Sequence, residues 1–235
     1  MIDIIYTYYN QHKCLTQYIN HWNNNFNDDV KKQLNIIIVD DHSQQYKASD
    51  TIKQHNIQFN TQIYYITDDK GFNVGGARNL GALKCTADRF LNMDFDLCFS
   101  ESNIKELLAL DVTDKCMYRI LRDAYKVKNG KKRQKYHHSA IVMLKSLWED
   151  GYIWDEDFAP LYGWEDHYFI KVFQEFGIEV KYVQIDFEKY KSGFTSNLKR
   201  GGLASRNFYT CKLECIQKPI NPIRFNYELE YDNII

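Results

Sequence analysis

The sequence predicts an α/β fold, a single domain whose mixed, mostly parallel sheet is flanked by helices. Two observations lead to this prediction. Short apolar runs alternate with stretches of helical spacing through residues 2–99, which is typical of strand–helix–strand units. Several runs, such as NIIIV at 35–39, are apolar without interruption, as in strands covered on both faces. With 235 residues, 44% of them hydrophobic, the chain can bury one sizeable core.

The first half follows a regular alternation of elements. Strands are expected at Ile2–Tyr8, 34–39, 62–67 and 90–95, and helices at 11–22, at 45–55 and in the glycine-rich stretch after residue 71. Right-handed crossovers between parallel strands bring the ends of these strands to one rim of the sheet. Thr7, Asp41 and Asp94 would therefore lie together, where open α/β sheets bind their ligands. The pattern predicts a nucleotide pocket at this rim.

Residues 71–100 carry the strongest chemical signal. The glycines of GGARNLG allow close backbone approach, and Arg78 adds a positive charge beside them. The next strand delivers Asp94 and Asp96. Residues i and i+2 of an extended strand share a face, so both carboxylates could bind one hard divalent cation. A lone D-x-D more often solvates a turn, but this one follows an apolar strand and a glycine-rich helix. The combination favours a metal-bridged diphosphate.

The second half is less regular. A helix is expected at 103–110, and strands at 115–121 and 139–144 flank a basic loop, 122–138, with seven Lys or Arg against one Asp. The turn dipeptide Asn129-Gly130 makes this loop a solvated hairpin tip in the simpler interpretation. Alternatively, it is an arm that grips an anionic acceptor or contacts a membrane surface peripherally. The sequence leaves both interpretations open.

A second informative stretch covers residues 148–177. Aromatic and aliphatic residues from Tyr168 to Phe176 form an apolar helical stripe that Gly177 would end. Glu165 and Asp166 stand at the helix start, where acidic residues are favoured for electrostatic reasons alone. The neighbouring Trp164 offers a flat apolar face suited to packing against a sugar ring, which favours a functional role for the pair. A strand at 179–184 and a basic tail follow, and Lys191 and Lys199 of that tail could add donors.

Composition limits the partners and the compartment. The net charge is −1, so no overall field draws the protein to nucleic acid. The six cysteines are scattered without the spacing of a zinc site, and we expect free, buried thiols. There is no apolar run long enough for a membrane span and no leader-like start, so a soluble, cytoplasmic protein is expected.

Four pieces of the sequence together resemble the GT-A glycosyltransferases, especially their inverting family 2 group. They are IIYTYYN at the first strand, IIIVDDHS at the second, GGARNLGALKCTADRFLNMDFD up to the D-x-D, and GWEDHYF at the late helix. These pieces occur in the family's order over about residues 2–177. The resemblance implies a GT-A (Rossmann-like) fold. It also implies transfer of a sugar from a nucleoside diphosphate sugar, UDP-linked above all, to an acceptor hydroxyl with inversion.

The resemblance also implies a set of nucleotide-binding residues. Thr7 and Tyr9 would line the base pocket. Asp41 would accept a hydrogen bond from the base or ribose, and Arg78 would steady the nucleotide. Asp94 would lie at the ribose as well as at the metal. These residues belong to a nucleotide-sugar-binding half at 1–100, followed by an acceptor half at 101–185 and a C-terminal tail at 186–235.

For the chemistry, the resemblance assigns a metal and a base. Asp94 and Asp96 would bind Mn²⁺ or Mg²⁺ bridging the diphosphate, and Asp166 would be the general base with Glu165 as helper. The chain departs from the family in two places. A proline usual after the first strand is absent, and no later histidine follows His167 to bind the metal. Few protein ligands would then hold the ion, as in Mg²⁺-like sites. The acceptor would be a glycan, glycolipid or glycoprotein.

Other functions stay open at this point. A sugar nucleotidyltransferase would carry a basic glycine-rich loop directly after the first strand, where this chain has YTYYNQH. A two-carboxylate glycosidase would need no nucleotide pocket. A dinucleotide oxidoreductase would show G-x-G-x-x-G after the first strand. A catalytically silent module that binds a nucleotide sugar or a glycan is disfavoured by the intact D-x-D and E-D pairs, but it is not excluded by them.

Overall fold

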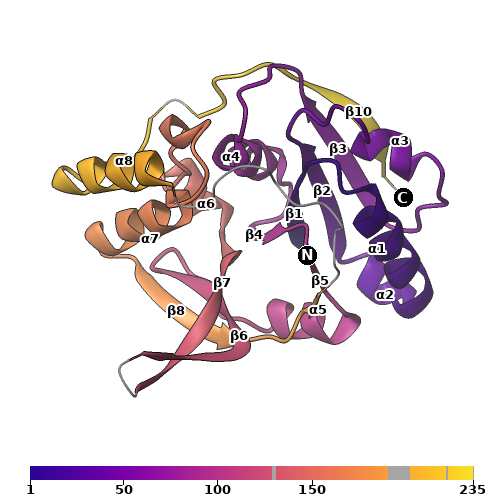
Figure 1. Ribbon diagram of the computed structural model, residues 1–235. Helices are drawn as coiled ribbons and strands as arrows, with labels where there is room; N and C mark the ends of the chain where they lie inside the picture. Colours follow the sequence, from indigo (N-terminus) through magenta and orange to yellow (C-terminus); the bar gives the residue numbers. More distant parts are fainter. Residues whose placement is uncertain (129–130, 190–201, 221, 235) are drawn as a thin grey trace.

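The computed structural model describes residues 1–128, 131–189, 202–220 and 222–234, and their side chains except those of 123–134 and 188–189. Its centre is an eight-stranded sheet with the strand order β10-β3-β2-β1-β4-β7-β6-β8 (Figure 1). The strands are β1 Ile2–Tyr8, β2 Leu34–Asp40, β3 Asn60–Ile66, β4 Arg89–Asp94, β6 Cys116–Lys128, β7 Lys131–Leu144, β8 Glu179–Gln184 and β10 Tyr227–Asn233. A small second sheet pairs β5 (Leu97–Cys98) with β9 (Glu188–Lys189).

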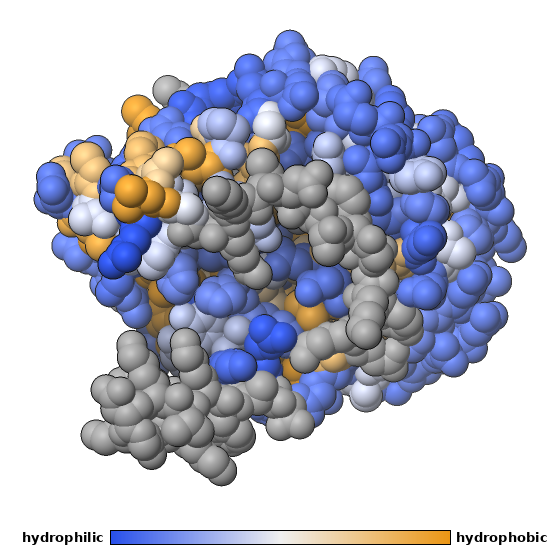
Figure 2. All heavy atoms as spheres, in the orientation of Figure 1, coloured by the Kyte–Doolittle hydropathy of each residue, from blue (hydrophilic) through white to orange (hydrophobic). Residues whose placement is uncertain are grey.

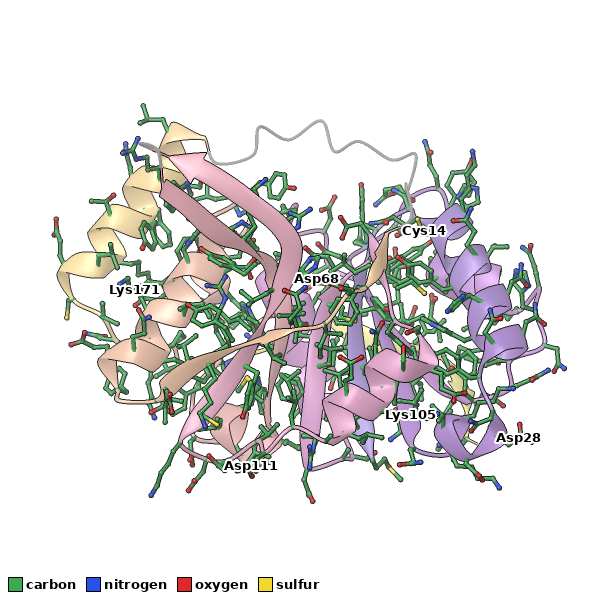
Figure 3. The ribbon with its side chains drawn as sticks, turned by 90° about the horizontal axis from the view of Figure 1, so that it is seen from below. Cys14, Asp28, Asp68, Lys105, Asp111 and Lys171 are labelled. Atoms are coloured by element: carbon green, nitrogen blue, oxygen red, sulfur yellow. The ribbon has the colours of Figure 1, made fainter. Side chains whose placement is uncertain are left out.

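Helices cover both faces of the large sheet. The helices are α1 His12–Asn25, α2 Asp28–Lys31, α3 Ala48–Ile52, α4 Val74–Lys84, α5 Glu101–Leu108, α6 Lys145–Glu149, α7 Glu165–Glu175 and α8 Leu203–Glu214, with a 3-10 turn, η1, at Glu156–Phe158. One hydrophobic core packs α1, α3 and α5 against the sheet, and the other packs α4, α6 and α7. In Figure 3, Asp28 of α2 and Lys171 of α7 lie at opposite ends of the molecule. This is the predicted α/β fold.

The parallel strands form the predicted rim. In the register of β1, Thr7 pairs with Asp94 of β4 on one side and with Val39 of β2 on the other. The strand ends that carry the polar residues therefore lie side by side. Helix α4 packs closely on this part of the sheet because Gly81 has no side chain. A methyl group at Gly81 would clash with the side chain of Ile5.

Two predictions about the elements need correction. The hairpin expected at 122–138 is present, since β6 and β7 pair antiparallel, but the expected basic loop is largely strand because both strands continue as far as Lys128 and Lys131. The alternation of polar and apolar residues in this segment is weak, and its many charged residues suggested a loop rather than strands. Strand β4 ends at Asp94 and Asp96 lies in the turn that follows, so the two carboxylates do not share the face of one extended strand.

The C-terminal tail is more ordered than expected. It contains helix α8 and strand β10, and β10 pairs antiparallel with β3 at the edge of the sheet. Lys191 and Lys199 lie outside the described residues. Hydrophobic residues gather around α8 at the left of Figure 2, and Leu203 in this helix is 74% exposed.

The structure tests the expectations about the cysteines and about membrane spans. All six cysteines are free, but the expectation of buried thiols is correct for only four, because Cys211 and Cys215 of the α8 region are exposed. Within the described residues, no helix combines the length and the apolar character that a membrane span requires.

Candidate functional site

Two adjacent carboxylates end strand β2 and organise the rim. Asp40 is fully buried and accepts hydrogen bonds from the backbone N–H groups of Ser43 (2.9 Å) and Ala48 (2.8 Å), while burial raises its pKa to about 6. Asp41 accepts from the backbone N–H of Asn73, at the start of α4, at 3.0 Å. Burial raises the Asp41 pKa to about 7. Asp40 is thus a structural cap, whereas Asp41 ties the end of β2 to the glycine-rich helix.

The residues proposed to line the base pocket differ in exposure. Thr7, at the end of β1, is 8% exposed and pairs in register with Asp94. Tyr9, just beyond β1, is 38% exposed. The following Asn10 accepts from the backbone N–H groups of Gln45 and Tyr46, which fixes the turn after the strand. The structure thus brings Thr7 and Asp94 together at the rim and leaves Tyr9 accessible above it.

Arg78 joins the two halves of the site. Its guanidinium is 1% exposed, donates from Nη2 to the Asp94 carboxylate at 3.0 Å and donates from Nη1 to the Asp166 carboxylate. The Arg78 side chain projects from α4, Asp94 ends β4, and Asp166 is in the first turn of α7. A buried guanidinium without such partners would be strongly unfavourable, so the two carboxylates and Arg78 form one interdependent unit.

The two carboxyl groups of the E-D pair, Glu165 and Asp166, are buried, and the pKa of each is raised. Glu165 and Asp166 are 6% and 7% exposed at the start of α7. Burial, followed by the neighbouring Asp166 charge, raises the Glu165 pKa to about 7. Burial also raises the Asp166 pKa, and the Arg78 guanidinium opposes that rise. The Oε2 atom of Glu165 is buried and has no hydrogen-bond partner among the described residues. The two adjacent carboxyl groups thus differ in their partners, because Asp166 is ion-paired with Arg78 whereas burial favours the neutral form of Glu165.

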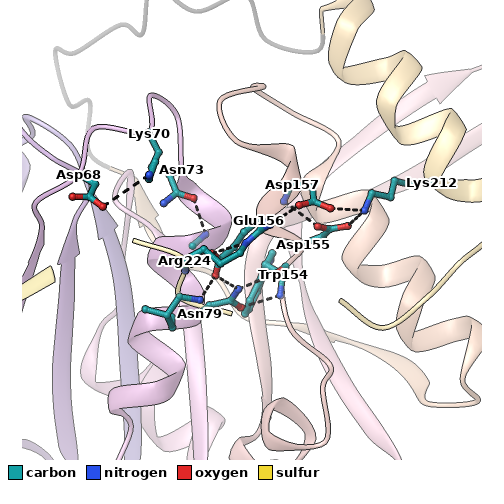
Figure 4. Close-up of polar contacts among 12 residues, drawn as sticks. Asp68, Lys70, Asn73, Asn79, Trp154, Asp155, Glu156, Asp157, Lys212 and Arg224 are labelled. Carbon is teal, nitrogen blue, oxygen red and sulfur yellow. Dashed lines mark hydrogen bonds and ion pairs between the residues drawn. The ribbon is translucent and has the colours of Figure 1, made fainter. Parts of the chain in front are cut away.

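Asn79 holds the start of α7 in place relative to α4 (Figure 4). Its Nδ2 donates to the Trp154 carbonyl and to Glu156, each at 2.9 Å, and its Oδ1 accepts from the Trp154 N–H at 2.9 Å. The Trp154 ring stacks on Phe169 of α7 with centroids 4.0 Å apart. The A-R-N sequence of α4 therefore serves two purposes, because Arg78 binds the carboxylates and Asn79 positions the helix that carries one of them.

Glu156 ties the C-terminal segment to the same region. Its carboxylate accepts from the backbone N–H groups of Ile223 (2.7 Å) and Arg224 (3.1 Å) as well as from Asn79. Arg224 in turn pairs with Asp157 at 2.8 Å. A hollow of about 440 Å³ lies beside this network and is lined in part by Lys70, Asn73 and Phe225. In Figure 4 this network lies beside the N-terminal end of α4.

Trp164 lies at the start of α7 and packs against aromatic neighbours. Its backbone is left-handed, with φ of 79°, which turns the chain sharply into the helix. Its ring stacks on Tyr209 of α8 with centroids 4.9 Å apart and lies 5.3 Å from the His167 ring. Trp164 is half-buried, so one part of the ring stays available to a ligand.

The D-x-D residues supply carboxylate oxygens, the ligands that hard divalent cations prefer, but from two different elements, the end of β4 and the turn after it. Asp94 is part of the Arg78 ion pair, and its side chain is still 40% exposed. Asp96 is exposed. The pKa of the Cys14 thiol is raised chiefly by the burial of that thiol and secondly by the charge of Asp96, so Asp96 lies toward α1. No cluster of three or more His, Cys, Asp or Glu side chains suited to a metal occurs in the described part of the chain. Two carboxylates plus substrate phosphates suffice for Mg²⁺-like ions, so the donor set is compatible with such an ion.

Sequence reasoning missed four residues of this region. Asn79 and Glu156 were not singled out because their function is visible only when α4 and η1 are packed together. Tyr209 lies in the C-terminal tail, for which no helix or strand was predicted. Arg119 was read as part of an ordinary strand, although a single arginine within an apolar strand run is itself an unusual signal.

Comparisons with known proteins identify a family and a shared fold. The model of the family described as Glycosyl transferase family 2 matches residues 3–177. The S. aureus TarS 1-349 structure in complex with UDP-GlcNAc has a TM-score of 0.57 and 13% identity, covering 83% of this chain and 61% of that one. No curated protein sequence matches the chain.

Two further solved structures share the fold. GalNAc-T7 with UDP, GalNAc and Mn²⁺ has a TM-score of 0.63 at 10% identity, over 91% of this chain and 47% of that one. The mannosyltransferase PcManGT from Pyrobaculum calidifontis, in complex with GDP-Man and Mn²⁺, has a TM-score of 0.61 at 13% identity, over 93% and 65%. The chain spans less than two thirds of each of these structures. Because the family model extends from β1 through α7 and its residues form this site, the chain belongs to glycosyl transferase family 2.

Proposed function

We propose that this protein transfers a sugar from a nucleoside diphosphate sugar, UDP-linked in the first instance, to an acceptor hydroxyl with inversion at the anomeric carbon. One observation carries the proposal. Arg78 links Asp94, at the nucleotide rim, to Asp166, at the start of α7, in a single buried unit. Such a unit sets the distance between a donor site and a base, which is what a single displacement requires.

Residues 1–100 form the donor half in this proposal. Thr7 and Tyr9 flank the nucleoside base, and Asp41 accepts from the base or ribose. Asp94 faces the ribose with its exposed oxygen while Arg78 holds the other. Asp94 and Asp96 would hold Mn²⁺ or Mg²⁺, which, when bound, neutralises charge on the departing diphosphate. Support comes from the neighbours, whose structures contain UDP-GlcNAc, UDP with Mn²⁺, and GDP-Man with Mn²⁺.

Residues 101–185 supply the acceptor side and the base. The acceptor oxygen forms a bond to the anomeric carbon, the bond from that carbon to the diphosphate oxygen breaks, and the hydroxyl proton passes to Asp166. Arg78 favours the ionised form of Asp166, against the burial that raises the Asp166 pKa, and orients the carboxylate for this transfer. Glu165, whose pKa is raised to about 7, adds no second full charge beside it. Trp164 packs against a sugar ring, with Tyr209 supporting its other face.

A donor screen tests the proposal. Nucleotide sugars linked to UDP, GDP and other nucleotides are incubated with the protein and Mn²⁺, and release of the nucleoside diphosphate is measured with and without chelator. We expect release from one class of donor, abolished by Asp96→Ala and by chelator. Asp166→Asn should bind the nucleotide normally and release it slowly. Arg206→Gln, on the exposed side of α8, is the control.

The same screen separates the rival functions. A silent binding module would bind a nucleotide sugar without releasing the diphosphate under any condition. A sugar nucleotidyltransferase would release pyrophosphate from a nucleoside triphosphate in the presence of a sugar phosphate. Product NMR that shows the donor's anomeric configuration retained would contradict the inverting mechanism and the role of Asp166.

A further inference from the structure

Arg119 is a buried cation whose hydrogen-bonding capacity is only partly used. It lies on β6 and is 3% exposed. Its Nε and Nη2 atoms are buried and have no hydrogen-bond partner among the described residues. Buried guanidinium groups in proteins are normally paired, because an unpaired one is strongly unfavourable. An unpaired guanidinium held inside the protein is therefore expected to meet an anion that the free protein does not contain.

The guanidinium is fixed in orientation. Its carbon lies 3.5 Å above the centroid of the Tyr136 ring on the neighbouring strand β7. This stacking restrains the plane of the guanidinium but offers no hydrogen-bond acceptor to its N–H groups. Arg119 is thus aimed and rigid, which is the arrangement of a ligand-binding arginine rather than of a flexible surface residue.

Arg119 lies on the acceptor side of the site. In the strand order β4-β7-β6, Arg119 is level with Ile141 of β7, and Ile141 is level with Asn92 of β4. The backbone of Arg119 is therefore two strand spacings, about 10 Å, from the strand that ends in Asp94. A chain of ring contacts connects Tyr136, which stacks on Arg119, to His167, the residue after the E-D pair. The ring centroids of Tyr136 and His138 lie 5.2 Å apart, and so do those of His138 and His167.

Other unpaired polar atoms lie in the same stretch of sheet. The Oδ1 atom of Asn92 and the Oγ atom of Ser139 are buried and also lack partners among the described residues. Asn92 Nδ2 donates to the Ser139 backbone carbonyl at 3.0 Å, which places the Asn92 side chain beside the backbone of β7. The charge of Arg119 affects two residues of α7. It opposes the rise that burial causes in the Asp166 pKa, and it adds to the fall that burial causes in the His167 pKa.

We propose that Arg119, aimed by Tyr136, binds an anionic group, a phosphate or a carboxylate, of the acceptor molecule. The acceptor is then a negatively charged molecule whose anionic group enters beside the hydroxyl presented to Asp166. The assignment to the acceptor rests on the proposed function, whereas the anion site rests on Arg119 itself. In the proposed function, the donor diphosphate binds at a different place, the rim around Asp94 and Arg78.

Calorimetry with small anions tests the proposal. The full chain is titrated at constant ionic strength with glycerol phosphate, D-glucuronate and uncharged glycerol, with and without saturating UDP and Mn²⁺. We expect one of the two anions to bind, glycerol not to bind, and UDP to leave anion binding in place. Arg119→Gln should weaken the dissociation constant for the anion at least about tenfold, as expected for loss of charge-assisted hydrogen bonds. Arg206→Gln, exposed on α8, should change it less than threefold.

A second variant guards against misfolding. If Arg119→Gln does not fold, Tyr136→Leu removes the stacking that aims the guanidinium and should weaken anion binding severalfold. Unchanged anion affinity in whichever variant folds, or no anion binding by the wild type, overturns the site. Displacement of the anion by UDP overturns its assignment to the acceptor and moves Arg119 to the diphosphate. Failure of UDP to bind at all contradicts the proposed function but leaves the anion result standing.

Discussion

The nucleotide rim and the start of α7 differ in how completely their buried polar groups are paired. At the rim, Asp40 and Asp41 accept backbone hydrogen bonds, and the Arg78 ion pair fixes Asp94; of these groups, Arg78 Nε alone is buried without a partner among the described residues. Around α7, Glu165 and Arg119 keep buried polar atoms without partners in the described part of the protein. The rim carboxylates are thus held by partners within the protein, whereas the α7 side has more buried polar atoms without a partner among the described residues. In the function that we propose, this difference separates residues that build the site from residues that bind the acceptor.

The largest effect is expected from removing the residue that joins the two regions. Arg78→Met would leave Asp94, Asp166 and Glu165 without their cation. Breaking a buried ion pair in this way typically costs about 3–5 kcal/mol, so we expect a loss of that order in the free energy of unfolding at pH 7. Urea denaturation measures it, and Arg206→Gln is the control. Adding Asp166→Asn to Arg78→Met should recover part of the loss. If the loss of unfolding free energy in the double variant equals the sum of the losses in the two single variants, Arg78 and Asp166 do not form one unit.

The tight packing beneath the rim predicts a smaller effect. In Gly81→Ala the new methyl group would clash with Ile5, and overpacking of this kind costs about 1–3 kcal/mol. Gly75→Ala, on the same helix, is the matched control, because its methyl group would lie 3.4 Å from the Trp154 Cβ, an ordinary contact. Thermal unfolding should show Gly81→Ala destabilised and Gly75→Ala unchanged or stabilised. Equal behaviour of the two variants would contradict the close approach of α4 to β1.

Glu165 predicts a pH-dependent effect. Its pKa is raised in the folded protein to about 7, so folding favours its neutral form. The corresponding stability is complete at pH below the ordinary glutamate pKa and is lost as the pH rises through about 7. Glu165→Gln avoids this loss. It should therefore stabilise the protein at pH 8 by about 3 kcal/mol and have little effect at pH 4. A Gln variant that is equally stable relative to wild type at both pH values would contradict the raised pKa.

The smallest effect is expected at the aromatic support of Trp164. Tyr209→Ala removes the stacked ring, and aromatic pairs of this kind contribute about 1 kcal/mol beyond their burial. Tyr209→Phe keeps the stack and is the control. Urea denaturation should distinguish the two variants. Indistinguishable unfolding free energies would show that α8 does not support the start of α7.

The two regions also differ in how well the sequence predicts them. Strand β1 and β8 were predicted with their observed ends, and the rim of Thr7, Asp41 and Asp94 follows from parallel crossovers that any α/β sequence obeys. The ion pair of Arg78 with Asp166 joins residues 88 positions apart, and no local pattern encodes that contact. Arg119 and Tyr136 meet only because β6 and β7 pair through a segment whose charges suggested a loop.

The central claim is that Asp166, held by Arg78 across from the nucleotide rim, takes the acceptor proton. Single-turnover sugar transfer by Asp166→Asn, measured alongside the nucleotide dissociation constant, tests it most directly. We expect nucleotide affinity within twofold of wild type and transfer slowed at least about 100-fold, the range for loss of a general base. Transfer within tenfold of wild type, in a folded variant with normal nucleotide affinity, would contradict this role and assign the proton to another group.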